Sequence, residues 1–497
     1  MMRVNRRECN GGHFELWTDE QIHEIHRASL EILAHTGVVV HDGEALALLR
    51  DNGAYVHENL ARIPASMVAD ALASAPSSIT LCSACGRKRS IHLYRNNVYY
   101  GIGTDLPAFV DSYTGEIRVT VLKDLANTAK IVQQAENIDF AAPFGLASDV
   151  DQDLADLYHF RAIRAYCDKP NWVTATNYGN MKAIIDMAAA SAGGYEQLRR
   201  NPSIGVYTEP ISPLLNSKEA LQKLLLCSEY GIPITYASGI MAGATGPVTL
   251  AGTVALGNAE GLAGLVMHQL KRRGSPFIYG NVCSAIDMST MVNLYGGPEL
   301  PLMHAAVAQM GRFYNLPSYG TGGCTDSNAL DAQAGMEAMF SNFVAGLAGS
   351  NLVHDNGYLG SGLVGSLEMI LLGNEAINTV KRFFKGIEIS EESLGLDMIH
   401  EVGPGGDFLS EDHTVRHFKA EIMHSRLLDR GQYQAWEKGG RLTMADRLTR
   451  EARRILETET PMLLGGDLPA QYDAIMERRR QEIAQGKFHK EDFNHAT

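Results

Sequence analysis

Short β-prone segments alternate with amphipathic helical segments through the middle of the chain, between about residues 98 and 390. This alternation is typical of repeated β/α units. The eight expected strands cover residues 98–102, 138–144, 172–177, 204–207, 234–237, 276–280, 318–321 and 351–354. Eight parallel strands with crossover helices predict an α/β fold, a (β/α)8 TIM barrel. Such barrels carry their active sites at the carboxyl ends of the strands.

The β/α pattern does not span all 497 residues, so further segments are expected at both ends. Residues 1–97 predict an N-terminal helical cap with small sheet elements, which opens with a capping box at Thr18. Residues 98–393 predict the barrel, with a hairpin that turns at Thr114 after the first strand. Residues 394–497 predict a C-terminal helical extension packed on the barrel.

Composition and charge narrow the class of protein. A formal net charge of −14 argues against nucleic acid or an anionic membrane surface as the main partner. The basic N-terminus is not followed by the apolar run of a secretory signal. The long uncharged stretch at 230–259 is broken by glycine and proline, which does not fit a membrane span. The seven cysteines are scattered, which suits a reducing compartment, and we expect a cytoplasmic protein.

Motifs for metals, nucleotides and nucleophilic serine are incomplete or missing in the sequence. Cys82 and Cys85 have the spacing of half a zinc knuckle, and His92 is near them in sequence. A structural zinc site normally takes four ligands, and no second pair stands at a matching distance. Two unrelated thiols near a turn is therefore the favoured interpretation. The motifs HExxH, GxSxG, GxGxxG and Walker A do not occur, so we expect no metal in the polypeptide.

Aromatic and acidic side chains gather at the expected strand ends. Aromatic faces together with a carboxylate suit a quaternary ammonium, which donates no hydrogen bond and is held by cation–π and Coulomb attraction. The candidate substrate-binding residues are Tyr100, Tyr207, His354, Asn356 and Tyr358, the histidine and asparagine as donors to a substrate carboxylate. The candidate catalytic residues, as carboxylates that face the ammonium, are Glu209 and Asp105. For His354 a purely structural role stays open.

The segment GIMAGATGP at residues 239–247 is rich in small residues, which allow a backbone to approach a ligand or a neighbouring element closely. A ligand-facing loop and a tightly packed barrel element are both compatible with it. The helix expected after it is nearly uncharged over residues 248–259, which indicates burial inside the barrel or at a subunit contact. On this basis we expect a homo-oligomer.

Six ordered motifs resemble one known family, between about residues 15 and 460. They are LWTDEQIHEIHRASLEILAHTGV, TEPISPL, GATGPVTLAGTVALGNAEGLAG, DSNALDAQAG, GPGGDFL with the later HT, and DRGQYQAWEKGG. Together they resemble the trimethylamine methyltransferase (MttB-like) family. The resemblance implies a TIM barrel that moves a methyl group from an amine to the Co(I) of cobalamin on a separate corrinoid protein. It implies no cofactor bound directly by this chain.

One position departs from the founding members of that family. They carry pyrrolysine near the position of Ala329 or Leu330, so this chain resembles the branch without pyrrolysine. Activities known in that branch are demethylations of quaternary amines such as glycine betaine, proline betaine, carnitine and γ-butyrobetaine. A quaternary ammonium leaves as a neutral tertiary amine and needs no general acid, whereas the methyl group of neutral trimethylamine leaves poorly.

The sequence therefore favours a glycine betaine methyltransferase, and two alternatives remain. One is a demethylase for another methylated amine, and the other is a catalytically silent ligand-binding barrel. A metal-dependent hydrolase is disfavoured because no expected strand carries a His-x-His pair.

Overall fold

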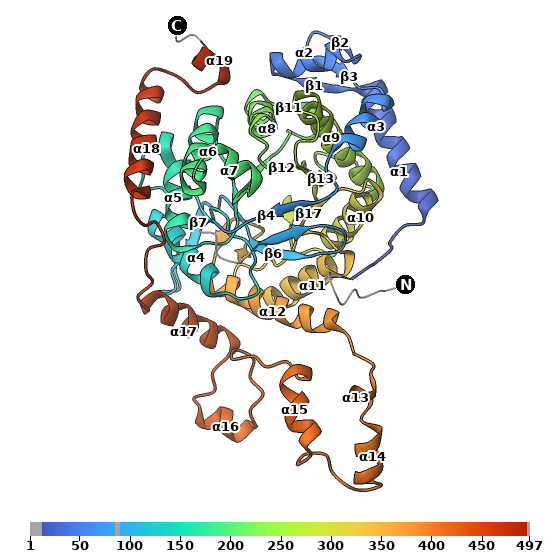
Figure 1. Cartoon of the computed structure of the whole chain (residues 1–497), viewed down its shortest axis with the longest axis vertical. Helices are drawn as coiled ribbons and strands as arrows, with labels where there is room; N and C mark the ends of the chain where they lie inside the picture. The colour runs from blue at the N-terminus through green and yellow to red at the C-terminus, as the bar shows by residue number, and fades with distance from the viewer. Residues whose placement is uncertain (1–11, 85–89, 495–497) are drawn as a thin grey trace.

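A seven-stranded parallel sheet forms the centre of the molecule in the computed structural model, which describes residues 12–84 and 90–494 (Figure 1). Its strands, in spatial order, are β6 (Tyr99–Ile102), β18 (Leu352–Asn356), β17 (Ser318–Thr321), β14 (Phe277–Gly280), β12 (Ile234–Tyr236), β10 (Ile204–Thr208) and β9 (Asn171–Val173). The first of these strands in the chain pairs with the last, which curls the sheet and brings all seven carboxyl ends to one side.

The second strand expected from the sequence, at 138–144, is not a continuous strand in the structure. This segment makes isolated parallel bridges to both edges of the sheet, Gly101 with Phe140 and Ala141 with Asn171. The carbonyl of Ile138 accepts a hydrogen bond from Lys169. Pro143 has no N–H to donate to a ladder. The structure therefore contains a seven-stranded parallel sheet where the sequence predicts eight strands.

Helices connect the strands and surround the sheet (Figure 1). In chain order they are α4 (Leu122–Gln134), η2 (Gln152–Leu154), α5 (Ala155–Tyr166), α6 (Tyr178–Ala192), α7 (Tyr195–Arg200), α8 (Lys218–Tyr230), α9 (Leu250–Lys271), α10 (Glu299–Phe313), α11 (Ala332–Ala348) and α12 (Leu367–Lys385). Among the described residues, α9 alone is long and apolar enough to cross a membrane, but 78% of its apolar window is buried inside the protein. A helix that is apolar on all sides in this way is a core helix.

The N-terminal region has the helices and small strands that the sequence predicts. It contains α1 (Asp19–Glu31), η1 (Ile32–Thr36), β1 (Val38–Val40), α2 (Gly43–Asp51), β2 (Tyr55–His57), β3 (Leu60–Arg62), α3 (Ala65–Ser74), β4 (Ile79–Leu81) and β5 (Ile91–Leu93). Thr18 caps α1 in a capping box with Gln21, as expected. β1 pairs with β11 (Leu215–Asn216), which lies in the connection after β10, so this region is joined to the central body.

Small strands also extend from the loops at the carboxyl ends of the sheet. The hairpin expected after β6 is present as β7 (Ala108–Val110) and β8 (Ile117–Val119). β7 also pairs with β20 (Val364–Gly365), which pairs with β19 (Tyr358–Leu359). A second small sheet contains β13 (Gly239–Ala242), β15 (Val282–Asp287) and β16 (Val292–Leu294).

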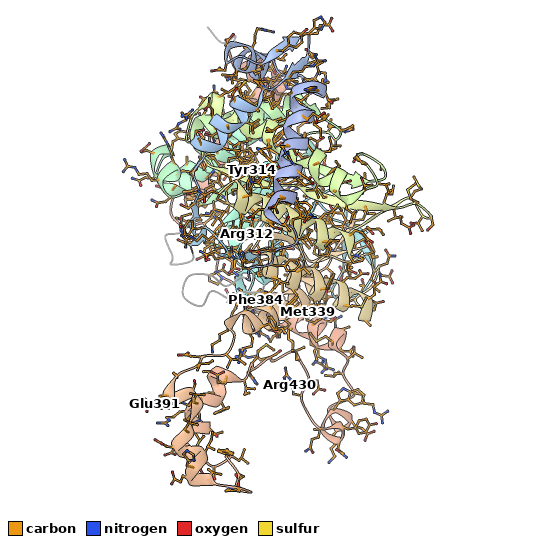
Figure 2. The ribbon with its side chains drawn as sticks, turned by 90° about the vertical axis from the view of Figure 1, so that its right-hand side faces the viewer. Arg312, Tyr314, Met339, Phe384, Glu391 and Arg430 are labelled. Atoms are coloured by element: carbon orange, nitrogen blue, oxygen red, sulfur yellow. The ribbon has the colours of Figure 1, made fainter. Side chains whose placement is uncertain are left out.

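The C-terminal extension divides into a part that packs on the body and a part that does not. α17 (Met444–Glu457) and α18 (Leu468–Ala484) each bury residues against the body, and α19 (Lys490–Asn494) follows them. By contrast, four short helices contain no buried residue, namely α13 (Glu391–Leu394), α14 (Leu396–Val402), α15 (Asp412–Glu421) and α16 (Tyr433–Lys438). They form an arm, residues 387–441, that projects from the body (Figures 1 and 2). The prediction that the whole extension packs on the barrel is wrong for this arm, because its helices have too little apolar surface in contact with the body.

Candidate active site

Aromatic rings from four strands meet on the inner face of the sheet. The rings of Tyr319 on β17 and His354 on β18 are stacked, with centroids 4.3 Å apart. Trp172 on β9 also stacks on Tyr319, with ring centroids 5.7 Å apart. Tyr207 on β10 lies 5.7 Å from Tyr319 and 6.4 Å from His354. Tyr207 and His354, which the sequence predicts as site residues, are therefore brought together.

Two glycines in the strands leave the space that these rings need. A Cβ atom on Gly205 would lie 1.9 Å from the Trp172 ring, and one on Gly101 would lie 2.2 Å from the Phe140 ring. No real side chain could occupy either place without displacing the ring. The inner face of the sheet is therefore filled by large aromatic residues below the strand ends.

Glu209, directly after β10, is held by the tyrosine two residues before it. The hydroxyl of Tyr207 donates to Oε2 of Glu209 at 2.6 Å. Burial raises the pKa of Tyr207 well above its ordinary value, so its hydroxyl stays a donor. The Glu209 side chain reaches solvent, yet protein atoms surround it on most sides, and this loss of hydration raises its pKa. The hydrogen bond from Tyr207 and the charge of Lys223 act in the opposite direction.

The glycine-rich segment after β12 runs beside this carboxylate. A Cβ atom on Gly239 would lie 3.3 Å from Oε2 of Glu209. Of the two interpretations left open by the sequence, this contact favours a segment that borders the site over a purely structural one.

Asp105 forms a second acidic group, beyond the end of β6. Its backbone is in the left-handed region with φ 62°, and its N–H donates to the carbonyl of Pro143. Thr174 Oγ1 donates to Oδ1 of Asp105 at 3.1 Å. Burial raises the pKa of Asp105 to about 6, and the nearby Asp156 carboxylate contributes to the increase. This carboxyl group therefore changes its charge just below neutral pH.

Lys223 on α8 is a site residue that sequence reasoning missed. Its Nζ donates to the carbonyl of Ala175, after β9, at 2.7 Å. Burial lowers the pKa of this ammonium, whereas the charges of Asp156, Asp105 and Glu209 act to raise it. A lysine in the middle of an amphipathic helix gives no sequence signal for a strand-end site. Its place between three carboxylates becomes visible only in the fold.

His354 has partners on both ring nitrogens. Nδ1 is paired with Oδ1 of the adjacent Asp355, and Nε2 lies 3.2 Å from Thr321 Oγ1. Asp355 is buried and has φ 78°. These contacts favour the structural alternative, in which His354 forms an aromatic wall with Tyr319 and Tyr207. A substrate carboxylate next to His354 would also be repelled by the charge of Asp355.

Tyr358 lies near the strand ends as expected, but its hydroxyl group is engaged with the backbone. It accepts from the N–H of Thr104 and donates to the carbonyl of the same residue, both at 2.6 Å. Its ring packs edge-on against Tyr295 at 6.3 Å. Burial raises the pKa of Tyr358 well above its ordinary value, and the negative charges of Asp355 and Asp105 raise it further. Tyr358 can thus offer a ring face but no free hydroxyl.

The structure places two predicted substrate-binding residues outside the site. The hydroxyl of Tyr100 donates to the carbonyl of Asn342 on α11, so this side chain points into the helix layer. Asn356 accepts from Asn342 Nδ2 and donates to the carbonyl of Gly101. Strand alternation turns Tyr100 outward. Asn356 changes face because the pairing of β18 with β6 shifts register between Val353 and Asn356.

Two further sets of positions that the sequence analysis names are the cysteine pair of the CxxC spacing and the residues Ala329 and Leu330. Cys82 is a free thiol, and Cys85 lies outside the described residues. Ala329 and Leu330 line a cavity of about 350 Å³ together with the β7–β8 hairpin and residues of α17. This cavity lies on the loop after β17, between that loop and the hairpin.

The assembled strand-end site has tyrosine rings above a buried indole, several carboxylates and one half-buried lysine. Such a site suits a small organic cation that also bears a negative group, bound at the carboxyl ends of a parallel sheet. Fold and site together define the class as an α/β protein with a candidate ligand site at the carboxyl ends of a parallel sheet.

Comparison with known proteins then gives the family. The family model for trimethylamine methyltransferase (MTTB) matches residues 4–484. The trimethylamine methyltransferase MttB of Desulfitobacterium hafniense (strain DSM 10664 / DCB-2) is 33% identical over 468 residues, which covers 94% of each chain. The glycine betaine methyltransferase of D. hafniense (strain Y51) is 30% identical over 474 residues, covering 95% of this chain and 98% of that protein. The chain therefore belongs to the trimethylamine methyltransferase family and is a methyltransferase, as its resemblance implied.

A solved structure with a similar fold supports the architecture alone. The monomethylamine methyltransferase (MtmB) of Methanosarcina barkeri superposes with a TM-score of 0.52 at 12% identity, covering 96% of this chain and 90% of that one. At this identity the similarity extends to the fold and not to the substrate.

Proposed function

We propose that this enzyme transfers a methyl group from a quaternary amine, with glycine betaine as the best single substrate, to the Co(I) centre of a corrinoid protein. The observation that carries the proposal is the Tyr207–Glu209 pair beside the stacked rings of Tyr319 and His354. The proposal also takes the central sheet as a closed eight-position barrel, which the bridges of Phe140 and Ala141 support.

The trimethylammonium end of the substrate fits the aromatic and acidic part of the site. A quaternary ammonium cannot donate a hydrogen bond, so ring faces and negative charge are what hold it. Tyr207, Tyr319 and His354 supply rings, and Glu209 supplies a carboxylate that the Tyr207 hydroxyl keeps oriented. Each ring contact is worth about 0.5–2 kcal/mol, depending on how far water is excluded.

The carboxylate end of a betaine needs a positive partner in this acidic site. We assign this role to Lys223, because the negative charges of Asp156, Asp105 and Glu209 act on its ammonium, whose Nζ donates to the carbonyl of Ala175. A substrate carboxylate beside Lys223 would favour the charged form of an ammonium whose pKa burial lowers. This assignment replaces His354 and Asn356, whose donors are used within the protein.

The reaction moves one methyl carbon and leaves the bonding electrons on nitrogen. A Co(I) corrinoid, carried by a separate protein, supplies the nucleophile that forms the new bond to the methyl carbon. The C–N bond breaks, and the tertiary amine leaves neutral, so no residue of this chain has to donate a proton. The chain's own residues hold the ammonium, exclude water and fix the direction of the methyl group. Such orientation can contribute up to about 7–11 kcal/mol in well-aligned systems.

The site geometry is compatible with access by a partner protein. Glu209 is exposed at the carboxyl ends of the strands, so the methyl group can be approached from that side. We propose no direct cobalamin site on this chain. We further propose a cytoplasmic homo-oligomer, for which the exposed apolar residues of the arm, such as Ile387, Leu409 and Ile422, offer contact surface.

A screen of quaternary amines tests the proposal. Purified enzyme, free cob(I)alamin and one amine at a time are followed by absorbance for methylcobalamin, and binding is measured in parallel by calorimetry. We expect methylcobalamin from glycine betaine. Formation from another betaine alone would identify the demethylase alternative. Binding without any methyl transfer, also when candidate corrinoid proteins are added, would identify the silent ligand-binding barrel.

A further inference from the structure

A cluster of metal-ligand side chains lies on the arm, apart from the strand-end site. His413 and His417 are one turn apart on α15, and their ring centroids are 4.3 Å apart. Nε2 of His417 lies 2.9 Å from Oε1 of Glu392, and Nε2 of His413 lies 2.9 Å from the carbonyl oxygen of the same residue. One ligand atom from each residue lies within 4.8 Å of the others. Figure 2 labels the neighbouring Glu391 on this part of the arm.

We propose that Glu392, His413 and His417 bind a divalent transition-metal ion, with Zn²⁺ as the best match. Two histidines four residues apart on a helix point to the same side, and two imidazoles with one carboxylate form a common three-ligand zinc set. Imidazole ligands favour Zn²⁺ and its transition-metal neighbours over Mg²⁺ or Ca²⁺. The remaining coordination position would be filled by water.

The surroundings of the cluster allow an ion to enter. A cleft of about 570 Å³ opens beside it, lined by residues that include Glu391, Glu392, Asp397 and His413. A glutamate at the surface is ionised near neutral pH, as a metal ligand must be. Arg416 lies 3.3 Å from Oε1 and would have to share this oxygen or move away.

The arm has a structural use for such an ion. None of its four helices buries a residue, so no hydrophobic core of its own holds it together. Small units without a sufficient core are commonly stapled by a metal. The C-terminal end of α15 is already fixed to the body, because Arg382 and Lys385 donate to the carbonyls of Glu421 and Ala420. An ion at Glu392 would fasten α13 to the opposite end of α15.

The sequence predicts no metal because its cysteine–histidine sets are incomplete. Here the glutamate precedes His413 by 21 residues and reaches it only through the fold of the arm, so spacing in the sequence does not indicate the cluster. The proposal is independent of the proposed methyl transfer, because the cluster contains no residue of the strand-end site.

Zinc titration of the full-length protein tests the site. Tag-free enzyme is stripped with EDTA, dialysed and titrated with ZnCl₂ by calorimetry, and its zinc content is then measured by elemental analysis. We expect one Zn²⁺ per chain, and at least tenfold weaker binding in each of His413→Ala, His417→Ala and Glu392→Gln. His424→Ala, which removes an exposed histidine of the arm outside the cluster, should bind zinc like the unaltered protein.

A second measurement keeps the test valid if a variant disturbs the arm. In the unaltered protein, Zn²⁺ should slow amide hydrogen exchange in α13 and α15, and EDTA should reverse the effect, while exchange in the central strands stays the same. Absence of zinc binding would overturn the proposal. So would zinc binding that survives all three ligand substitutions, or binding without any change of exchange in the arm.

Discussion

The Tyr207 hydroxyl lies 2.6 Å from Oε2 of Glu209 and donates a hydrogen bond to it. The two residues stand at the end of one strand and share a side, so the ring and the carboxylate can face the same ligand. The hydrogen bond lowers the pKa of Glu209, which burial raises. Tyr207 therefore has two roles, as a ring surface and as the hydrogen-bond donor that opposes the increase in the pKa of Glu209.

Removing the hydroxyl separates these roles. In Tyr207→Phe the ring remains, the pKa of Glu209 rises further, and binding of a quaternary ammonium should begin at higher pH than in the unaltered enzyme. Where Glu209 becomes protonated, the ligand loses the Coulomb attraction of the carboxylate, about 1–4 kcal/mol at a separation near 4 Å, so the affinity should fall by roughly tenfold or more. Calorimetric titration with glycine betaine between pH 5 and about 9 measures this.

Tyr100→Phe is the matched control. It removes a buried hydroxyl that donates to Asn342, so it should cost about 1 kcal/mol of stability without changing the pH profile of binding. Equal effects of the two substitutions on binding would contradict the placement of Tyr100 in the helix layer.

Asp105 is expected to weaken the fold at neutral pH. Its pKa of about 6 lies above its ordinary value of 3.8, so ionisation costs more in the folded than in the unfolded chain. This cost is absent well below pH 4 and complete above pH 6. Asp105→Asn should therefore raise the free energy of unfolding at pH 8 by up to about 3 kcal/mol, and by much less at pH 4. Denaturant titrations at the two pH values measure the difference, and a gain that is equal at both would rule out this origin.

Lys223 should decide between substrates that have a carboxylate and those that do not. In Lys223→Met, glycine betaine should bind about ten- to a hundredfold more weakly, because the substrate carboxylate loses a charged partner. Choline should be affected less, because it has no carboxylate that loses a partner: removal of the competing cation favours its binding, while the higher pKa of Asp105 and Glu209 without Lys223 acts in the opposite direction.

Lys218→Met on the same helix is the control for this comparison. Lys218 pairs with Glu491 near the C-terminus and makes no contact with the strand-end groups described above. Its substitution should leave both affinities unchanged. Equal losses for glycine betaine and choline in Lys223→Met would show that Lys223 only supports the structure.

Substitutions of His354 test whether this residue provides a ring surface or holds the substrate carboxylate. Because both ring nitrogens have protein partners, His354→Ala should weaken glycine betaine and choline by similar factors. His354→Phe keeps a ring that can stack on Tyr319 and should recover part of the affinity for both. A loss restricted to glycine betaine would instead restore the expectation from sequence that His354 holds the substrate carboxylate.

The sequence predicts the strands well where each is a short apolar run followed by a helix, as at 318–321 and 204–207. The prediction of a continuous strand at 138–144 is wrong. There the carbonyl of Ile138, which a strand would use for pairing, accepts a hydrogen bond from Lys169. The sequence also places His354 and Asn356 on one face, because simple alternation cannot foresee the positive φ of Asp355 between them.

The sequence also predicts some residues of the candidate site and misses others. Tyr207 and Glu209 are predictable because they end a strand, and strand ends of a parallel sheet converge. Lys223 and Trp172 are not, since one comes from a helix face and the other from the interior of a strand. The sequence does not predict the arm because its helices have ordinary amphipathic sequences. Only the fold shows that their apolar faces do not pack against the body.

The central claim is that the enzyme demethylates a quaternary ammonium in preference to a tertiary amine. Initial rates of methylcobalamin formation from glycine betaine and from trimethylamine, at equal concentrations with the same cob(I)alamin, compare the two directly. We expect glycine betaine to react faster, and Glu209→Gln to slow that reaction by roughly tenfold or more at subsaturating substrate, because the cation loses the Coulomb attraction of the carboxylate, about 1–4 kcal/mol at a separation near 4 Å. Faster demethylation of trimethylamine than of every betaine tested would contradict the account.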